Sequence, residues 1–208
     1  MLPRLGLSCV LWLGLWSSAC HHIKSDYSGY LEKHRASPPL PRVGIPAGYH
    51  ITETTLKHRL DVRSARAGYG NIWIIELGEM LEQTMLSSEV RELFMGLHDE
   101  APSAPGYVVA FELVDYQVSG FSAHLTLRIA LRHDGVALVD RVYAADGAGQ
   151  AGKVIGAGAF AMRHALHATT KNAVDTVLRQ FLLDAQRALR GSILASDGTR
   201  RVLDPSHP

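Results

Sequence analysis

A glycine-rich stretch from Gly147 to Lys153 carries residue types that could bind a phosphate group. It reads Gly-Ala-Gly-Gln-Ala-Gly-Lys, which matches the G-x-G-x-x-G pattern of dinucleotide-binding loops and the G-x-x-x-x-G-K pattern of phosphate-binding loops. A phosphate loop continues with Ser or Thr, but Val154 stands there. A dinucleotide loop needs a β-α-β unit, and no strand pattern follows. We expect a flexible connection, and a secreted enzyme or nucleotide-binding sensor that uses Gly147–Lys153 is the alternative hypothesis.

The histidines give a weaker signal for metal binding. His164 and His167 are three residues apart and could share a helix face, but the sequence identifies no third ligand for a zinc site. We expect this pair to lie on the surface or at a helix start. His58 is expected to be a core or edge residue rather than a general base, and His21–His22 to be solvated. No metal and no cofactor are therefore predicted.

Motifs of hydrolytic catalysis are absent from the sequence. It contains no G-x-S-x-G elbow and no H-E-x-x-H pair. Both cysteines, Cys9 and Cys20, lie within the first twenty residues, so the folded part has no thiol nucleophile and no structural disulfide. The chain is predicted not to be an enzyme.

The composition is typical of one globular domain with appendages. The chain has 208 residues, 47% of them hydrophobic, and a formal net charge of +1. Because there is no basic excess, a nucleic-acid partner is not expected.

The first twenty residues have the pattern of a bacterial export signal. A short basic start ends at Arg4, an apolar run extends from Leu5 to Trp16, and small residues precede Cys20. This run is too short for a permanent membrane helix. The small residues ending at Cys20 resemble the lipobox of bacterial lipoproteins, although Ser17 stands where lipoboxes most often have Leu. The resemblance implies a lipid on Cys20, with plain secretion after cleavage behind Ala19 as the alternative.

Four parts are predicted along the chain. The segment after Cys20 contains Ser-Pro-Pro-Leu-Pro-Arg-Val-Gly-Ile-Pro, which has neither helical nor strand periodicity and favours an extended linker. The predicted parts are a signal peptide (1–19), a lipid-anchored proline-rich tether (20–48), an α+β domain (49–191) and a C-terminal tail (192–208).

An antiparallel meander over Tyr107–Ala144 is the strongest structural signal. From Ala123, alternate residues are apolar, as in a half-buried strand, and Asp134–Gly135 suits a two-residue hairpin turn. The predicted elements are a strand (56–63), a helix (73–94) that kinks or restarts at Ser87–Ser88, three strands (107–118, 123–133, 136–144) and a helix (159–189). This order predicts a β-α-β-β-β-α two-layer sandwich, with a four-stranded, largely antiparallel sheet and both helices on one face.

The position of Asp140 is open at this level. A two-residue turn at Asp134–Gly135 would point Asp140 toward the core and place Arg128 directly opposite Arg141. Either Asp140 lies at the periphery of the sheet, or a bulge shifts the register.

The outward positions of the predicted strands form a candidate partner-binding face. Arginine suits phosphate and carboxylate groups, so this face is either a solvated surface or a docking surface for an anionic lipid, a polysaccharide phosphate or an acidic protein. The candidate partner-binding residues are Lys57, Arg59, Arg63, Arg128, Arg132, Arg141 and Tyr143.

The export signal, the lipobox-like Cys20, the tether and the order of elements together resemble the ABC-type transport auxiliary lipoproteins and their LPS-assembly-like relatives. The resemblance covers most of residues 50–190, and no specific motif beyond the cysteine carries it. It implies a non-catalytic component of an envelope transport or assembly system. Because His21, and not aspartate, follows Cys20, we expect an anchor in the outer membrane that faces the periplasm.

Overall fold

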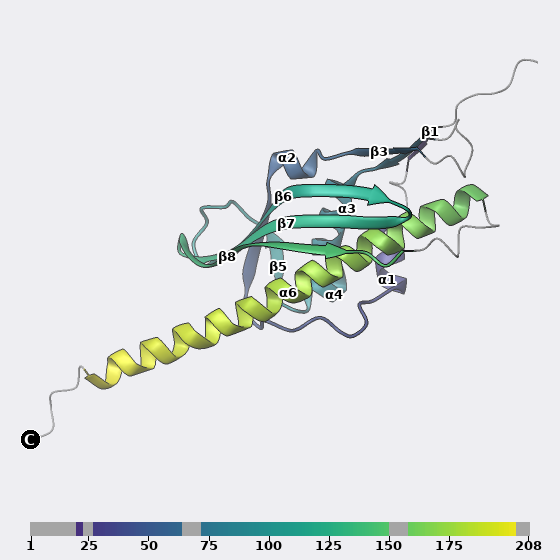
Figure 1. The fold of residues 1–208 in the computed structure, drawn as a ribbon. Coiled ribbons are helices and arrows are strands. Elements are labelled where there is room, and N and C mark those ends of the chain that lie inside the picture. The colour runs from purple at the N-terminus through teal and green to yellow at the C-terminus, as the bar shows by residue number, and fades with distance from the viewer. Residues whose placement is uncertain (1–19, 23–26, 64–71, 150–157, 203–208) are drawn as a thin grey trace, which may run out of the picture.

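The computed structural model describes residues 20–22, 27–63, 72–149 and 158–202, which form an α+β fold (Figure 1). This confirms the predicted fold class. One sheet has the strand order β5-β2-β6-β7-β8, and a smaller sheet has the order β1-β4-β3. The strands are β1 (Cys20–His22), β2 (Ala47–Ile51), β3 (Leu60–Arg63), β4 (Ile72–Ile75), β5 (Leu97–Asp99), β6 (Tyr107–Ser119), β7 (Ser122–His133) and β8 (Val136–Asp146). The helices are α1 (Tyr27–Lys33), α2 (Glu53–Leu56), α3 (Leu77–Leu86), α4 (Ser88–Arg91) and α6 (Gly158–Val202).

The predicted antiparallel meander is present as β6, β7 and β8. The turn between β7 and β8 has positive φ at both Asp134 (50°) and Gly135 (81°). A two-residue hairpin turn of this kind matches the twist of the strands it joins, which is why Asp-Gly predicts it.

One face of the meander is buried against α6. Leu125, Leu127 and Ile129 are completely buried, and the ring of Phe181 meets Phe111 edge-on with centroids 6.5 Å apart. The buried apolar residues of α6 recur every three or four positions, as expected for a helix with one buried face. Helix α3 contributes Leu77, Met80, Leu81 and Met85 to the same core.

The larger sheet differs from the predicted four-stranded one. It has five strands and is mixed, because β2 pairs in parallel with both β5 and β6. The segment 56–63, predicted as its first strand, instead contains the end of α2 and β3, and β3 pairs with β4 in the smaller sheet. Strand β2 is buried at four of its five residues and so shows no alternation that would reveal it.

The helix predicted over 73–94 is divided into three elements. Residues Ile72–Ile75 form β4, since a run of three isoleucines and a tryptophan packs well on a pleated surface. Helix α3 then ends at Leu86. The Ser87 side chain accepts a hydrogen bond from the Val90 N–H and caps α4, so the predicted restart at this serine is confirmed.

Both ends of the predicted domain are also different in the structure. The segment predicted as a tether packs on the body from Tyr27 onward, and Tyr27, Leu31, Ala36 and Leu40 are buried in the core. Helix α6 continues past Leu189, where it was predicted to end, to Val202, and its C-terminal part extends beyond the sheet (Figure 1). None of the helices in the described segments is both long enough and apolar enough to cross a membrane.

Candidate functional site

The outer face of the larger sheet is the face of β6, β7 and β8 opposite the core, and Arg128 lies at its centre. The Arg128 guanidinium donates two hydrogen bonds to Asp140, from Nε to Oδ1 at 2.8 Å and from Nη2 to Oδ2 at 2.9 Å. Glu112 lies 3.7 Å away on the other side. This pairing lowers the pKa of Asp140 and raises that of Arg128. A cation predicted to be free for a partner is therefore already neutralised within the sheet.

A bulge in the β7–β8 ladder decides the position of Asp140. The register shifts between Leu131 and Arg132, so that Ala130 pairs with Asp140 and Ile129 pairs with Arg141. Of the two alternatives for Asp140, the bulge is confirmed. The predicted pairing of Arg128 with Arg141 is wrong, because the shift turns these two side chains to opposite faces of the sheet.

Arg141 and Tyr143 belong to the core side of β8. The Arg141 guanidinium and the Tyr143 hydroxyl both donate to Oδ2 of Asp184 on α6, at 3.0 and 3.1 Å. Tyr143 is buried edge-on against Phe181, and burial raises the pKa of its hydroxyl. These two residues hold α6 against the sheet and are not part of the outer face.

The three cations of the predicted first strand lie elsewhere. Lys57 follows α2 and pairs with Glu53. Arg59 donates to Asp61 at 3.1 Å beside the smaller sheet. Arg63 ends β3, and its side chain lies outside the described residues. The seven predicted partner-binding residues are thus distributed over three regions, and only Arg128 and Arg132 share the outer face.

A hollow of about 290 Å³, the outer-face hollow, lies beside Arg128. Its surroundings include Ala110, Ala130 and the side chain of Arg132. Within the described residues, the Arg132 guanidinium makes no hydrogen bond, and its charge helps to lower the pKa of the neighbouring Asp140. Two exposed valines, Val114 (56% exposed) and Val142 (58% exposed), lie on the same face. The other lining residues are His50, Thr52, Pro102, Phe111, Glu112, Arg128 and Asp140.

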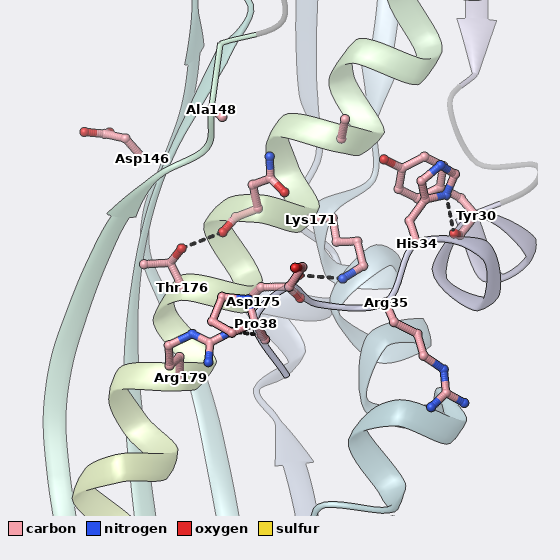
Figure 2. A pocket seen from close by; sticks show the side chains of 13 residues that line it. Tyr30, His34, Arg35, Pro38, Asp146, Ala148, Lys171, Asp175, Thr176 and Arg179 are labelled. Atoms are coloured by element: carbon pink, nitrogen blue, oxygen red, sulfur yellow. Dashed lines mark hydrogen bonds and ion pairs between the residues drawn. The ribbon is translucent and has the colours of Figure 1, made fainter. Parts of the chain in front are cut away.

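A second hollow of about 610 Å³ lies between α6, the end of β8 and the strap, defined as residues 34–43 (Figure 2). In this strap hollow, Lys171 of α6 is only 3% exposed. Its Nζ donates to Oδ2 of Asp175 at 2.5 Å and lies 3.9 Å from Oε2 of Glu89 on α4. Burial raises the pKa of Asp175, and Lys171 opposes this shift.

The polar groups of the strap hollow hold the strap in place. Arg179 donates to the carbonyl oxygens of Pro38 and, at 2.8 Å, Pro39 (Figure 2). Glu89 accepts a hydrogen bond from the N–H of Ala36 at 2.8 Å, and Gln186 donates to the Arg42 carbonyl at 2.6 Å. The chain itself therefore uses the hydrogen-bonding capacity of these side chains.

Of the two histidines expected on the surface or at a helix start, only one lies on the surface. His164 is exposed, whereas His167 is buried, with Tyr27 and Tyr30 edge-on at centroid distances of 5.2 and 5.5 Å. His58 lies edge-on to Tyr116, and burial lowers its pKa. Across the described segments, no cluster of three or more His, Cys, Asp or Glu side chains could hold a metal ion.

Gly147, the first glycine of the predicted phosphate loop, has a packing role. Its N–H donates to the Ala123 carbonyl at 2.7 Å. A Cβ at this position would lie 1.8 Å from the carbonyl oxygen of Thr169 on α6. This close approach of α6 explains why position 147 is a glycine, and no bound phosphate is needed for the explanation. Residues 150–157, including most of the motif and Lys153, lie outside the described residues.

Sequence reasoning missed much of the lining of both hollows. His50, Thr52 and Pro102 come from outside the meander, and no local pattern marks them. A signal for the outer-face hollow is the pair of alanines, Ala110 and Ala130, each of which has larger residues directly before and after it in its strand.

Comparisons with known proteins add little to this picture. No protein-family model matches the chain, and no curated protein matches it. Among solved structures, the chain is similar to the crystal structure of protein XCC0632 from Xanthomonas campestris, family DUF330, with a TM-score of 0.46 and 16% identity over 75% of this chain and 94% of that one. At this TM-score and identity the likeness carries no argument about function.

Proposed function

We propose that this protein is a non-catalytic bacterial envelope lipoprotein, held by a lipid on Cys20 at the periplasmic side of the outer membrane. Its outer sheet face docks an anionic partner, and it acts as an accessory or assembly component of an envelope transport system. The export signal before Cys20 supports the location. The resemblance to transport auxiliary lipoproteins supports the role.

The observation that carries the docking part of this proposal is the exposed outer face. Val114 and Val142 are more than half exposed there, beside a hollow and the unpaired Arg132. Apolar side chains grouped with an unpaired cation are typical of a surface that binds another molecule. The bidentate pair of Arg128 and Asp140 holds the middle of this surface in a fixed arrangement.

The position of Cys20 is compatible with an anchor that is close to the body. Cys20 is the first residue of β1, and it pairs with Ile72 of β4. Figure 1 shows β1 at the end of the molecule away from the turn between β7 and β8. A lipid on Cys20 would therefore attach the membrane to one end of the fold and leave the outer face directed to the side.

Metabolic labelling with a radioactive fatty acid tests the anchor. The wild-type chain should take up label, and Cys20→Ala should take up none. Cys9→Ala is the matched control, because Cys9 lies inside the predicted signal peptide and should not affect labelling. Absence of label on the wild type, or equal label on Cys20→Ala, contradicts the lipoprotein proposal.

A further inference from the structure

The outer-face hollow owes its space to two alanines that face each other across neighbouring strands. Ala110 of β6 pairs with Ala130 of β7. The same row continues to His50 on β2 and to Asp140 on β8. The two alanine side chains in the middle of this row are smaller than the histidine and aspartate side chains at its ends, which leaves a depression over the alanines.

A loop closes one side of the hollow. The N–H of Glu100 donates to the Tyr49 carbonyl at 2.9 Å, and a Cβ on Gly48 would lie 2.4 Å from the Cβ of Glu100. The chain after β5 therefore folds closely over β2, and Pro102 from this loop lines the hollow. The sheet thus presents a walled depression and not a flat surface.

One of the two guanidinium groups at the hollow makes no hydrogen bond within the described residues. Arg128 is held between Asp140 and Glu112. Arg132 lies two residues beyond Ala130 on β7, and its charge acts on Asp140 from a distance. Its five N–H donors make no hydrogen bond to any other part of the described chain. The group that complements a free guanidinium best is a carboxylate or phosphate, which can accept two parallel hydrogen bonds.

We infer that the partner is a protein that inserts an acidic side chain into the outer-face hollow, where its carboxylate pairs with Arg132. This inference rests on the proposed docking function and names its partner. Pockets for drug-sized ligands measure about 300–1,000 Å³. The hollow, at about 290 Å³, lies at the lower end of this range and has room for one inserted side chain. Val114 and Val142 provide apolar contacts for the residues around that side chain.

A membrane surface or lipid headgroup is less well matched to this face. Recognition of anionic lipid surfaces depends on clusters of about four to eight Lys or Arg residues. The outer face of β6 to β8 offers Arg128, which is paired, and Arg132, and it also carries Glu112 and Asp140. A single carboxylate matches the one guanidinium that makes no hydrogen bond, whereas an anionic membrane needs several such cations on one face.

Site-specific photocrosslinking of the full chain in its native cells tests the inference. A photoreactive phenylalanine replaces the exposed Val142, and we expect it to capture one protein. Arg132→Glu should reduce the crosslinking yield at least tenfold, and Arg132→Gln should reduce it less. Arg190→Glu is the matched control, because Arg190 is an exposed arginine of α6, the helix that packs on the opposite face of the sheet. It should change the yield less than twofold.

A charge exchange makes the test specific for a carboxylate. Mass spectrometry of the crosslinked peptides identifies the nearest Asp or Glu of the captured protein. Replacing that residue by Lys should abolish crosslinking to the wild type and restore it with Arg132→Glu. The inference is overturned if no protein is captured, if lipid or polysaccharide is captured instead, if Arg132→Glu retains the yield, or if the exchange restores nothing.

Fatty-acid labelling in the same cells separates this inference from the proposed function. If Cys20 is labelled but no crosslink depends on Arg132, the lipoprotein proposal stands and the inference of an acidic protein partner is rejected. If a crosslink depends on Arg132 but Cys20 is not labelled, the proposed docking surface stands and the proposed lipid anchor is rejected.

Discussion

The strap hollow has about twice the volume of the outer-face hollow, 610 against 290 Å³, and it contains more charged side chains. Its lysine and its two arginines are nevertheless engaged by the chain itself. Lys171 pairs with Asp175, Arg179 donates to the carbonyls of the strap, and Arg35 donates to Ser88. The smaller hollow keeps one guanidinium, that of Arg132, without a hydrogen bond in the described chain. The two hollows therefore differ in unused hydrogen-bonding capacity, and this difference is the reason why the proposal places the binding surface at the smaller one.

Removal of the support shared by both hollows should have the largest effect. Phe181 lies on α6 and contacts both Phe111 and Tyr143 of the sheet. Phe181→Ala should reduce the free energy of unfolding by about 3–5 kcal/mol, because it deletes a buried ring and leaves a cavity. Urea denaturation measures this loss. A change below about 1 kcal/mol would contradict the described packing of α6 on the sheet.

Breaking the ion pair of the strap hollow should have the next largest effect. Asp175→Ala leaves the buried Lys171 with Glu89 as its nearest acid, so we expect a loss of about 3 kcal/mol in the free energy of unfolding. The double variant Lys171→Met/Asp175→Leu should recover most of this loss, because it removes both charges together. Equal stability of the single variant and the wild type would show that this lysine is solvated.

The two hollows should respond to pH with opposite signs. The pKa of Asp175 is raised, so the folded state binds its proton more tightly than the unfolded state. Its contribution to stability is present below the ordinary pKa and is lost as the pH rises through the raised value. The pKa of Asp140 is lowered, so its contribution is present above the ordinary pKa and is lost as the pH falls through the lowered value.

Unfolding measurements between pH 3 and pH 6 test these signs. Relative to the wild type, Asp175→Asn should become more stable as the pH rises, and Asp140→Asn less stable. Because Asp140 lies at the exposed surface, its effect should be the smaller of the two. Parallel stability curves for the wild type and Asp175→Asn would contradict the burial of this carboxylate.

Removal of the paired arginine from the outer face should have little effect on folding. Arg128→Ala breaks a half-exposed ion pair, so the midpoint of thermal or urea unfolding should stay close to that of the wild type. Arg132→Ala, the matched variant without a hydrogen bond to break, should shift the midpoint even less. A shift for Arg128→Ala as large as that for Phe181→Ala would show that this network supports the sheet more than surface pairs do.

The smallest expected effect belongs to the glycine-rich connection. Lys153→Ala should leave stability unchanged, and titration calorimetry of the wild type with ATP or NAD should detect no binding. Binding to the wild type that is lost in Lys153→Ala would favour the alternative of an enzyme or nucleotide sensor.

The meander could be predicted because its signal is local. Alternate apolar residues in β7 and the Asp134–Gly135 turn determine a hairpin without reference to the rest of the chain. Strand β2 could not be predicted, since it is buried on both faces and shows no alternation. The packing of the strap could not be predicted either, because its prolines indicate a linker although some of its residues are buried in the core.

The candidate site was predictable only in part for the same reason. Arg128 and Arg132 were placed on the correct face by alternation. The bulge after Leu131 shifts the register by one residue, so that Arg128 lies beside Asp140 and on the opposite face from Arg141. No local sequence pattern predicts this shift. Which arginine is free therefore became evident only from the register.

The length of α6 has a consequence for amide hydrogen exchange. Its 45 residues extend about 68 Å at 1.5 Å per residue, whereas the 13 residues of β6 extend about 43 Å, so part of the helix has no sheet beneath it (Figure 1). Residues around Val177 and Phe181 should exchange only when the whole domain unfolds. Beyond Leu189, the overhanging turns are short for an isolated helix in water and should exchange by local fraying, independently of the global stability.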